Sequence, residues 1–226
     1  MKTVLITGGA TGIGAQTAEI FKKNGYNVYA GYNKTKPQNM PCVKLDVTNN
    51  DEIEAAVAQI GEVDILINNA GIAQQKLFTD ITEDDWQHMI NVNLSGAYRV
   101  TKAVLPAMIK KKSGVIINIS SVWGIVGASC EVHYSAAKAG LIGLTKALAK
   151  ELAPSGIRVN CVAPGIVDTK MNTALSDSDK AAVCEDIPLG RIGTAQEIAQ
   201  SIYFLSTDDA AYITGQVLSP NGGWVI

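Results

Sequence analysis

The feature that most constrains the fold is a glycine-rich turn between a short apolar segment and a segment of helical pattern. Residues 2–7 are apolar and β-rich, residues 7–14 read T-G-G-A-T-G-I-G, and residues 15–24 have a helical pattern that Gly25 ends. Glycines let a backbone approach a diphosphate, and the following helix offers free N–H groups and the positive end of its dipole. Because the flanking strand and helix are both present, the motif predicts a dinucleotide-binding turn rather than a plain tight turn.

The rest of the chain repeats the order of strand and then helix. Further strands are expected at 27–31, 42–45, 63–67, 115–119, 157–162 and 216–218, and further helices at 48–60, 80–95, 97–112, 134–152 and 195–204. This alternation predicts one α/β domain over residues 1–226, a doubly wound parallel sheet (Rossmann) of about seven strands with helices on both faces. Residues 35–40 are too few, and too closely bounded by proline, to form a full crossover helix. The connection from the second to the third strand is therefore expected to be short.

Composition excludes several classes of function. The chain has 226 residues, of which 47% are hydrophobic and 18% charged, with a net charge of −2 and no basic face, so a nucleic-acid partner is not expected. It has no apolar run of 18 residues, so a membrane span is not expected either. Four scattered cysteines and two histidines argue against a metal site and fit reduced thiols in the cytoplasm.

A candidate proton-transfer pair lies in the stretch Ser121 to Lys138. Tyr134 and Lys138 are four residues apart in a helical pattern, so both side chains emerge on one face. An ammonium near a phenol favours the phenolate and is expected to lower the phenol's pKa. Ser121 follows the apolar run 115–119, at the end of a strand where open α/β sheets bind ligands. Taken alone, such a pair is more often a packed ring beside a solvated amine.

The segment after the second strand bears on cofactor choice. An NAD-specific fold usually has an acidic residue about 20 residues after the glycine turn. Here no acidic residue occurs between Glu19 and Asp46, and Lys34 and Lys36 lie in that gap, which favours NADP(H) over NAD(H). Solvated loop lysines are the alternative. Asp46 could accept a hydrogen bond from an adenine amine or serve only as a strand-end turn residue.

Two other segments carry specific expectations. Asn91 and Asn93 lie inside the expected helix 80–95, where asparagine is unfavourable, so one of them is expected to interrupt the helix or to be a buried, hydrogen-bonded amide. The polar stretch from 169 to 193, with Met171, Leu175 and Ile187 scattered in it, is the candidate for a mobile substrate lid.

With these motifs in place, the whole chain resembles the short-chain dehydrogenase/reductase (SDR) family, in the subgroup called classical. The resemblance rests on T-G-G-A-T-G-I-G, N-N-A-G at 68–71, N-V-N-L at 91–94, Ser121, Y-S-A-A-K at 134–138 and P-G-I-V-D-T at 164–169. It implies that Tyr134 donates the proton to a carbonyl, Ser121 polarises that carbonyl, Lys138 binds the nicotinamide ribose, and Asn93 holds a water in a proton relay. Cofactor contacts are expected from Gly8, Thr11, Gly12, Ile13, Gly14, Tyr32, Asn33, Lys34, Asp46, Val47, Asn69, Ala70, Gly71, Tyr134, Lys138, Pro164, Gly165, Ile166 and Thr169.

Within the family, the chain looks most like bacterial 3-oxoacyl-acyl-carrier-protein reductases, which reduce a 3-keto group with NADPH during fatty acid biosynthesis. It also resembles the elongation factor P 5-aminopentanone reductase group. Ser155 stands where carrier-protein reductases present an arginine, and Glu131 could pair with a cationic amine, although a solvated carboxylate is the simpler reading. Substrate contacts are expected from Ser121, Trp123, Glu131 and Tyr134.

Two other functions remain as alternatives. An NAD-linked alcohol or sugar dehydrogenase would be favoured by an acidic residue near position 32, where Tyr32 stands. A non-catalytic dinucleotide-binding regulator would be favoured by loss of Tyr134 or Lys138, and both are present. The resemblance also implies a homotetramer, and a carrier protein or elongation factor P as a possible protein substrate.

Overall fold

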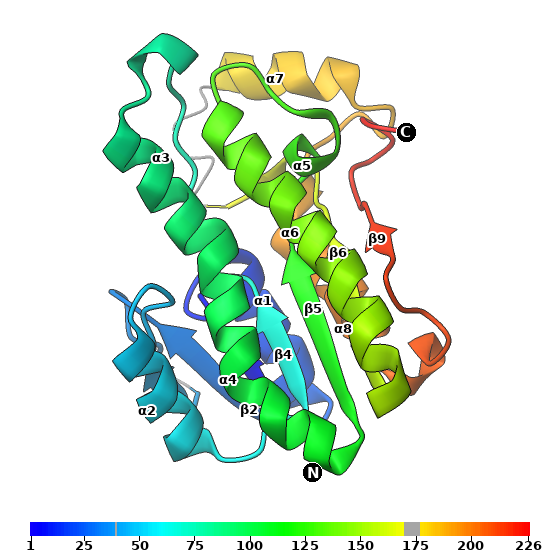
Figure 1. Cartoon of the computed structure of the whole chain (residues 1–226). Helices are drawn as coiled ribbons and strands as arrows, with labels where there is room; N and C mark the ends of the chain where they lie inside the picture. Colours follow the sequence, from blue (N-terminus) through cyan, green and yellow to red (C-terminus); the bar gives the residue numbers. More distant parts are fainter. Residues whose placement is uncertain (39, 170–176) are drawn as a thin grey trace.

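Seven parallel strands form the central sheet in the order β3-β2-β1-β4-β5-β6-β9 (Figure 1). The computed structural model describes residues 1–38, 40–169 and 177–226. The strands are β1 (Thr3–Ile6), β2 (Asn27–Tyr32), β3 (Cys42–Lys44), β4 (Ile65–Asn68), β5 (Gly114–Ile119), β6 (Ile157–Val162) and β9 (Val217–Leu218). The order reverses between β1 and β4, and ligands of open α/β sheets bind at such a point. The predicted doubly wound α/β sheet is confirmed.

Helices cover both faces of this sheet, as the sequence predicted. The helices are α1 (Gly12–Lys23), α2 (Asn50–Ile60), α3 (Glu83–Ile90), α4 (Gly96–Lys111), α5 (Trp123–Val126), α6 (Val132–Leu152), α7 (Asp177–Asp186) and α8 (Ala195–Ser206). α2, α4 and α6 pack on one face, and α1 and α8 pack on the other. α3, α5 and α7 gather beyond the arrowheads of the strands (Figure 1). In the described part of the chain, no helix has the length and apolar character that crossing a bilayer requires.

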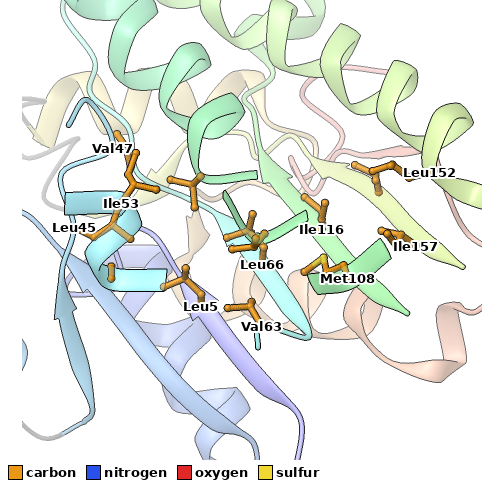
Figure 2. Close-up of a cluster of buried hydrophobic side chains, with 14 of the residues drawn as sticks. Leu5, Leu45, Val47, Ile53, Val63, Leu66, Met108, Ile116, Leu152 and Ile157 are labelled. Carbon is orange, nitrogen blue, oxygen red and sulfur yellow. The ribbon is translucent and has the colours of Figure 1, made fainter. Parts of the chain in front are cut away.

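Two hydrophobic cores follow from the alternation of side chains along each strand. Leu5, Leu66 and Ile116 point to the face covered by α2, α4 and α6 (Figure 2). Their neighbours Ile6 and Ile67 point to the other face, where α1 and α8 cover them. Because parallel strands are buried on both faces, they read in the sequence as continuous apolar runs.

A ladder of buried amides and hydroxyls crosses the first of these cores. Asn68 of β4 pairs in register with Asn118 of β5, and its Nδ2 donates to Asn118 Oδ1 at 2.9 Å and to Thr101 Oγ1 of α4 at 3.0 Å. Asn118 Nδ2 in turn donates to Thr145 Oγ1 of α6 at 2.9 Å. Buried amides require such partners, so the ladder fixes α4 and α6 to the centre of the sheet.

The expected helix over 80–95 is interrupted. A 3₁₀ turn (Phe78–Asp80) precedes α3, and a π-helical turn (Asn91–Ser95) joins α3 to α4. Thr82 begins α3 with a capping box, because its hydroxyl accepts from the Asp85 N–H and the Asp85 carboxylate accepts from the Thr82 N–H. The interruption foreseen at the asparagines is confirmed, and such π-turns often mark functional sites.

Two connecting segments carried specific predictions from the sequence, and the structure describes one of them more completely than the other. The link from β2 to β3 contains no helix among its described residues, as expected. Of the candidate lid, α7 and residues 187–193 are described, and β8 (Gly193–Thr194) at its end pairs with β7 (Val167–Asp168) just before it. The rest of that segment, residues 170–176 with Met171 and Leu175, lies outside the described residues.

Candidate active site

The glycine turn forms a cradle that side chains would fill. Gly8 and Gly12 have positive φ angles of 62° and 54°, which favour glycine. A Cβ at Gly14 would lie 2.4 Å from the Gly8 carbonyl oxygen. α1 begins at Gly12, three residues before the sequence suggested, and Thr11 gives it no side-chain cap. The first N–H groups of the helix are therefore directed at the cradle, which fits a diphosphate.

A residue that the sequence analysis missed holds this turn against the N-N-A-G segment. Thr7 Oγ1 accepts from the N–H groups of Asn69 and Ala70, both at 3.0 Å. Asn69 Nδ2 donates to the carbonyl oxygens of Thr7 and Gly8 at 3.0 and 3.1 Å. The side chain of Asn69 is therefore committed to holding the turn, and Ala70 lies beside it.

The P-G-I-V-D-T segment meets the same turn from the other side. A Cβ at Gly12 would lie 3.5 Å from Thr169 Cγ2. A Cβ at Gly165 would lie 2.9 Å from the Asn221 Cα, so the backbones of two loops touch there. Pro164 accepts from the Val122 N–H, and Ile166 accepts from the Gly193 N–H, both at 3.0 Å. The side chain of Ile13 packs against the core under α1 and α8, so a cofactor contact from this residue stays a prediction for its backbone N–H.

The adenine end of the candidate cleft is organised by Asp46. Asn33 Nδ2 donates to Asp46 Oδ2 at 2.7 Å, and Thr48 donates its N–H and hydroxyl to Oδ1. Although partial burial opposes it, these bonds and the nearby Lys44 hold the pKa of Asp46 below its usual value. Its carboxylate is therefore held in place as a turn residue, and its remaining lone pairs leave the other expected role, acceptance from an adenine amine, as a prediction.

The other residues expected at the adenine end are placed as follows. Lys34 and Lys36 are exposed, and Tyr32 ends β2. Val47 does not offer its side chain to the cleft, because it is buried in the core, where a Cβ at Gly96 would lie 2.7 Å from its Cγ2.

Ser121 and Tyr134 come together at the carboxyl end of β5. Both side chains are buried, and they are hydrogen-bonded to each other. Ser121 Oγ accepts from the Trp123 N–H at 3.2 Å, so its hydroxyl hydrogen is directed elsewhere. A serine hydroxyl and a phenol this close together can both donate hydrogen bonds to the oxygen of one carbonyl group.

The ionisation of this pair corrects the sequence-based expectation. Lys138 was expected to lower the pKa of Tyr134, but burial raises the pKa of Tyr134 to about 12. Burial also lowers the pKa of Lys138 itself to about 8. Desolvation disfavours the charged form of each group, and Lys138 is not among the groups that shift the pKa of Tyr134. Tyr134 is therefore a protonated phenol at neutral pH.

Lys138 and Asn93 face each other across Gly71. Lys138 Nζ donates to the Ile119 carbonyl oxygen at 2.8 Å. A Cβ at Gly71 would lie 2.8 Å from Asn93 Oδ1 and 3.4 Å from Lys138 Nζ. The glycine of the N-N-A-G segment is thus required by close approach to both residues. The four expected catalytic residues, Asn93, Ser121, Tyr134 and Lys138, therefore lie around one point.

The side chain of Asn93 is fully engaged. Its Nδ2 donates to the carbonyl oxygens of Ile72 and Met89, and its Oδ1 accepts from the Ile72 N–H. The second reading of the sequence, a buried and hydrogen-bonded amide, therefore holds together with the interrupted helix.

The substrate side of the site is aromatic and contains one carboxylate. Trp123 packs beside Tyr134 and makes an edge-on contact with Trp224, with ring centroids 4.9 Å apart. Glu131 is half-buried at the start of α6 and accepts hydrogen bonds from the side chains of Gln75 and Trp123. Burial raises the pKa of Glu131, so this group is not the solvated carboxylate of the simpler reading.

Two residues beside this site had no clear signal in the sequence. Trp224 comes from the far end of the chain, and only the fold brings it to Trp123. His133 directly precedes Tyr134 and is fully buried, which a helical pattern alone does not reveal. Among the described residues, no group of His, Cys, Asp and Glu could hold a metal ion.

Comparison with known proteins agrees with this geometry. Residues 8–225 match a family model described as "Enoyl-(Acyl carrier protein) reductase". The chain is 43% identical to the 3-oxoacyl-[acyl-carrier-protein] reductase FabG of Thermotoga maritima over 100% of this chain and 98% of the relative. It is 43% identical to FabG of Escherichia coli K12 and 42% identical to FabG of Chlamydia trachomatis, in each case over 98% of this chain and 96% of the relative.

These relatives match the chain from end to end, and the glycine cradle and the Ser121–Tyr134–Lys138 cluster lie at the switch point of the sheet. The chain therefore belongs to the short-chain dehydrogenase/reductase family of oxidoreductases, which use a nicotinamide dinucleotide to interconvert carbonyl and hydroxyl groups.

Proposed function

We propose that this enzyme is an NADP(H)-dependent reductase of 3-oxoacyl groups carried on acyl carrier protein. The observation that supports this most is the buried, hydrogen-bonded pair Ser121 and Tyr134 at the end of β5, in a chain that is 42–44% identical to 3-oxoacyl-[acyl-carrier-protein] reductases. Reduction of a ketone needs a proton for the oxygen and a hydride for the carbon. The dinucleotide, when bound, supplies the hydride.

Tyr134 supplies the proton in this proposal. With a pKa raised to about 12, the phenol is protonated at neutral pH and can donate its hydrogen to the carbonyl oxygen. Ser121 donates a second hydrogen bond to the same oxygen in this proposal, since acceptance from the Trp123 N–H leaves its O–H hydrogen available. The two donors together stabilise the negative charge that develops on that oxygen.

Lys138 and Asn93 would return a proton to Tyr134. The pKa of Lys138, lowered to about 8, puts this amine close to exchange at physiological pH. The amide of Asn93 is occupied by Ile72 and Met89, so a water in the relay would be held by the backbone carbonyl of Asn93. The π-helical turn at this residue supports such a role, since it alters the regular backbone bonding.

Preference for NADP(H) over NAD(H) is part of the proposal. Lys34 and Lys36 are exposed just beyond β2, where the fold directs the adenine ribose. Asn33 is bonded to Asp46 and to Lys44 Nζ, which gives this loop a defined shape. A 2′-phosphate would find cations here, and the carboxylate of Asp46 nearby is already bonded to Asn33 and Thr48.

A second substrate class is favoured by Glu131. Its half-buried carboxylate lies close enough to influence Tyr134, and Trp123, which contacts Trp224, lies beside it. A carboxylate with an aromatic neighbour suits an ammonium group. The alternative substrate is accordingly an amino-ketone, such as the 5-aminopentanone modification of elongation factor P.

One assay separates the two substrates. NADPH and NADH oxidation would be followed with acetoacetyl-acyl-carrier-protein and with 5-aminopentanone-modified elongation factor P, using the wild type and Glu131→Gln. The main proposal expects NADPH-dependent reduction of the acetoacetyl group, unchanged within threefold by Glu131→Gln. Exclusive turnover of the amino-ketone, lost in Glu131→Gln, would replace it with the alternative.

We also infer a homotetramer, on the basis of the family. Its support in this chain is a set of exposed apolar side chains on α4, α8 and β9, namely Tyr98, Ile109, Phe204 and Leu218. Light scattering during size-exclusion chromatography would give the mass of the assembly. A stable monomer of 23.9 kDa would contradict the inference.

A further inference from the structure

A partly buried series of hydrogen bonds leads to the residue before Tyr134. His133 is fully buried in the first turn of α6, and its Nε2 lies 2.9 Å from Gln74 Oε1. Gln74 Nε2 donates to Asp85 Oδ1 of α3 at 3.0 Å. Lys76 Nζ donates to the other oxygen of Asp85 at 2.6 Å. Three elements that are separate in the sequence thus meet in one chain of polar contacts, beside the packed helices α3 and α6 (Figure 1).

The charges along this series of hydrogen bonds determine which tautomer His133 adopts. Lys76 and the other donors hold the pKa of Asp85 well below its usual value, so its carboxylate can only accept. Gln74 must therefore turn its NH₂ group to Asp85 and its oxygen to the histidine. The His133 Nε2 then carries the hydrogen, and His133 Nδ1 is a buried lone pair without a partner among the described residues.

Protonation of this histidine is disfavoured by its surroundings. Burial lowers the pKa of His133, nearby Asp85 opposes this effect, and nearby Lys76 supports it. A second N–H at Nδ1 would lack an acceptor. His133 is thus held as a neutral donor with one tautomer, and a group in that state suits the positioning of a neighbour better than proton transfer.

The loop that contains Gln74 is connected to both halves of the active site. Ile72 is bonded to Asn93, the residue of the π-turn. Lys76 donates its N–H to the Cys130 carbonyl oxygen at 2.7 Å, just before α6. Residues 72–76 therefore link Asn93 to the first turn of α6, and the Gln74–His133 bond joins this link to the residue directly before Tyr134 in the sequence.

We propose that Gln74 and His133 are positioning residues that fix the Tyr134 hydroxyl relative to Ser121. The inference rests on the proposed reductase function, since it assigns them an effect on proton transfer by Tyr134. The hydrogen bond restrains the first turn of α6 at the residue next to the phenol. A small displacement of a catalytic group reduces turnover far more than it reduces cofactor binding.

The test compares matched variants at His133 and Gln74. His133→Phe keeps the ring but loses the N–H, whereas His133→Gln can place an amide N–H where Nε2 lies. We expect His133→Phe to lower kcat about tenfold or more with the Kd for NADPH within twofold, and His133→Gln to keep kcat within threefold. Gln74→Leu, in a half-buried loop position, should reproduce the loss, and the double variant should lose no more than either single one.

Readouts without turnover keep this test separate from the proposed function. The chain has two histidines, so ¹⁵N spectra with His88→Gln as an assignment variant report the tautomer of His133 directly. With ¹³Cζ-labelled tyrosine, the Tyr134 signal should stay single in His133→Gln and broaden or split in His133→Phe.

Failure of the proposed function and failure of the positioning role give different results. If the wild type reduces no ketone, the proposed function fails and the tyrosine spectra still decide the positioning role. Full kcat in His133→Phe, additive losses in the double variant, an Nδ1–H tautomer, or an unchanged Tyr134 signal in His133→Phe would each overturn the inference.

Discussion

The amine of Lys138 lies 5.5 Å from the centroid of the Tyr134 ring, on the same face of α6. Both groups are buried, and burial moves their pKa values in opposite directions, to about 12 for the phenol and about 8 for the amine. At neutral pH the phenol is uncharged and the amine is mostly charged. The site therefore holds a neutral acid beside a cation that loses its proton readily, as proton delivery to a carbonyl oxygen requires.

Removal of the phenol hydroxyl should abolish turnover without unfolding the protein. Tyr134→Phe is expected to lower kcat by about 10²–10⁴-fold, because the general acid is lost. The ring still packs against Met89 and Ala137, so the Kd for NADPH should change less than threefold, as fluorescence titration would measure. Tyr212→Phe, at a fully exposed tyrosine, is the control. Normal turnover by Tyr134→Phe would remove the proposed acid.

Replacement of Lys138 should separate activity from stability. Burial lowers the amine pKa from 10.5 to about 8, so at pH 7 the charged amine opposes folding by about 3 kcal/mol. Lys138→Met removes this opposition but loses the bond to Ile119. We expect an inactive variant that is about 1–3 kcal/mol more stable than the wild type at pH 7 in urea unfolding.

The difference in stability between Lys138→Met and the wild type should depend on pH. Between pH 8 and 10.5 the unfolded wild type binds more protons at Lys138 than the folded one, so wild-type stability rises with pH. The advantage of Lys138→Met should shrink across this window. Lys146→Met, at an exposed position of the same helix, should show no such trend. A Lys138→Met variant less stable than the wild type at pH 7 would contradict the expectation.

Two glycines should respond oppositely to alanine. At Gly71 the added Cβ would lie 2.8 Å from Asn93 Oδ1, so Gly71→Ala should displace the amide that holds Ile72. We expect a loss of about 1–3 kcal/mol in unfolding free energy and at least a tenfold loss of kcat. At Gly143, exposed in the interior of α6, a Cβ meets nothing within 4 Å, so alanine should add about 0.5–1 kcal/mol. Equal effects at both glycines would contradict this reading.

Cofactor preference should depend on the loop after β2. Lys34→Ala with Lys36→Ala is expected to raise the Kd for NADPH about tenfold or more, because charge-assisted bonds to a phosphate are lost. The Kd for NADH should stay within twofold in the same titrations. Lys23→Ala, exposed in the last turn of α1, is the matched control. A parallel change in both Kd values would argue against recognition of the 2′-phosphate.

Much of the fold could be predicted because local signals and fold agree. The strands are continuous apolar runs, since parallel strands are buried on both faces, and Asn93 broke the helix where asparagine is unfavourable. The start of α1 was misplaced by three residues, because a helix of this kind begins inside its glycine turn. Glycine has low helix propensity, and only tertiary packing requires it there.

The site was less predictable where it depends on distance in space. The pairing of Tyr134 with Lys138 follows from helical spacing, but the direction of the Tyr134 pKa does not, because burial is a property of the whole fold. Trp224 and His133 likewise acquire their surroundings only when loops from distant segments meet. Thr7 reads in the sequence as one more strand residue, and only the fold places its hydroxyl against the backbone that follows β4.

The amide ladder between β4 and β5 has a consequence for how the chain reaches its native alignment. Sliding β4 by one residue past β5 would turn Asn68 toward the opposite core and leave Asn118 facing aliphatic neighbours. Each amide would lose its hydrogen bonds in an interior that contains no water to replace them. Competing alignments of the central strands are thereby penalised, and the chemistry at the ends of those strands is assembled in one arrangement.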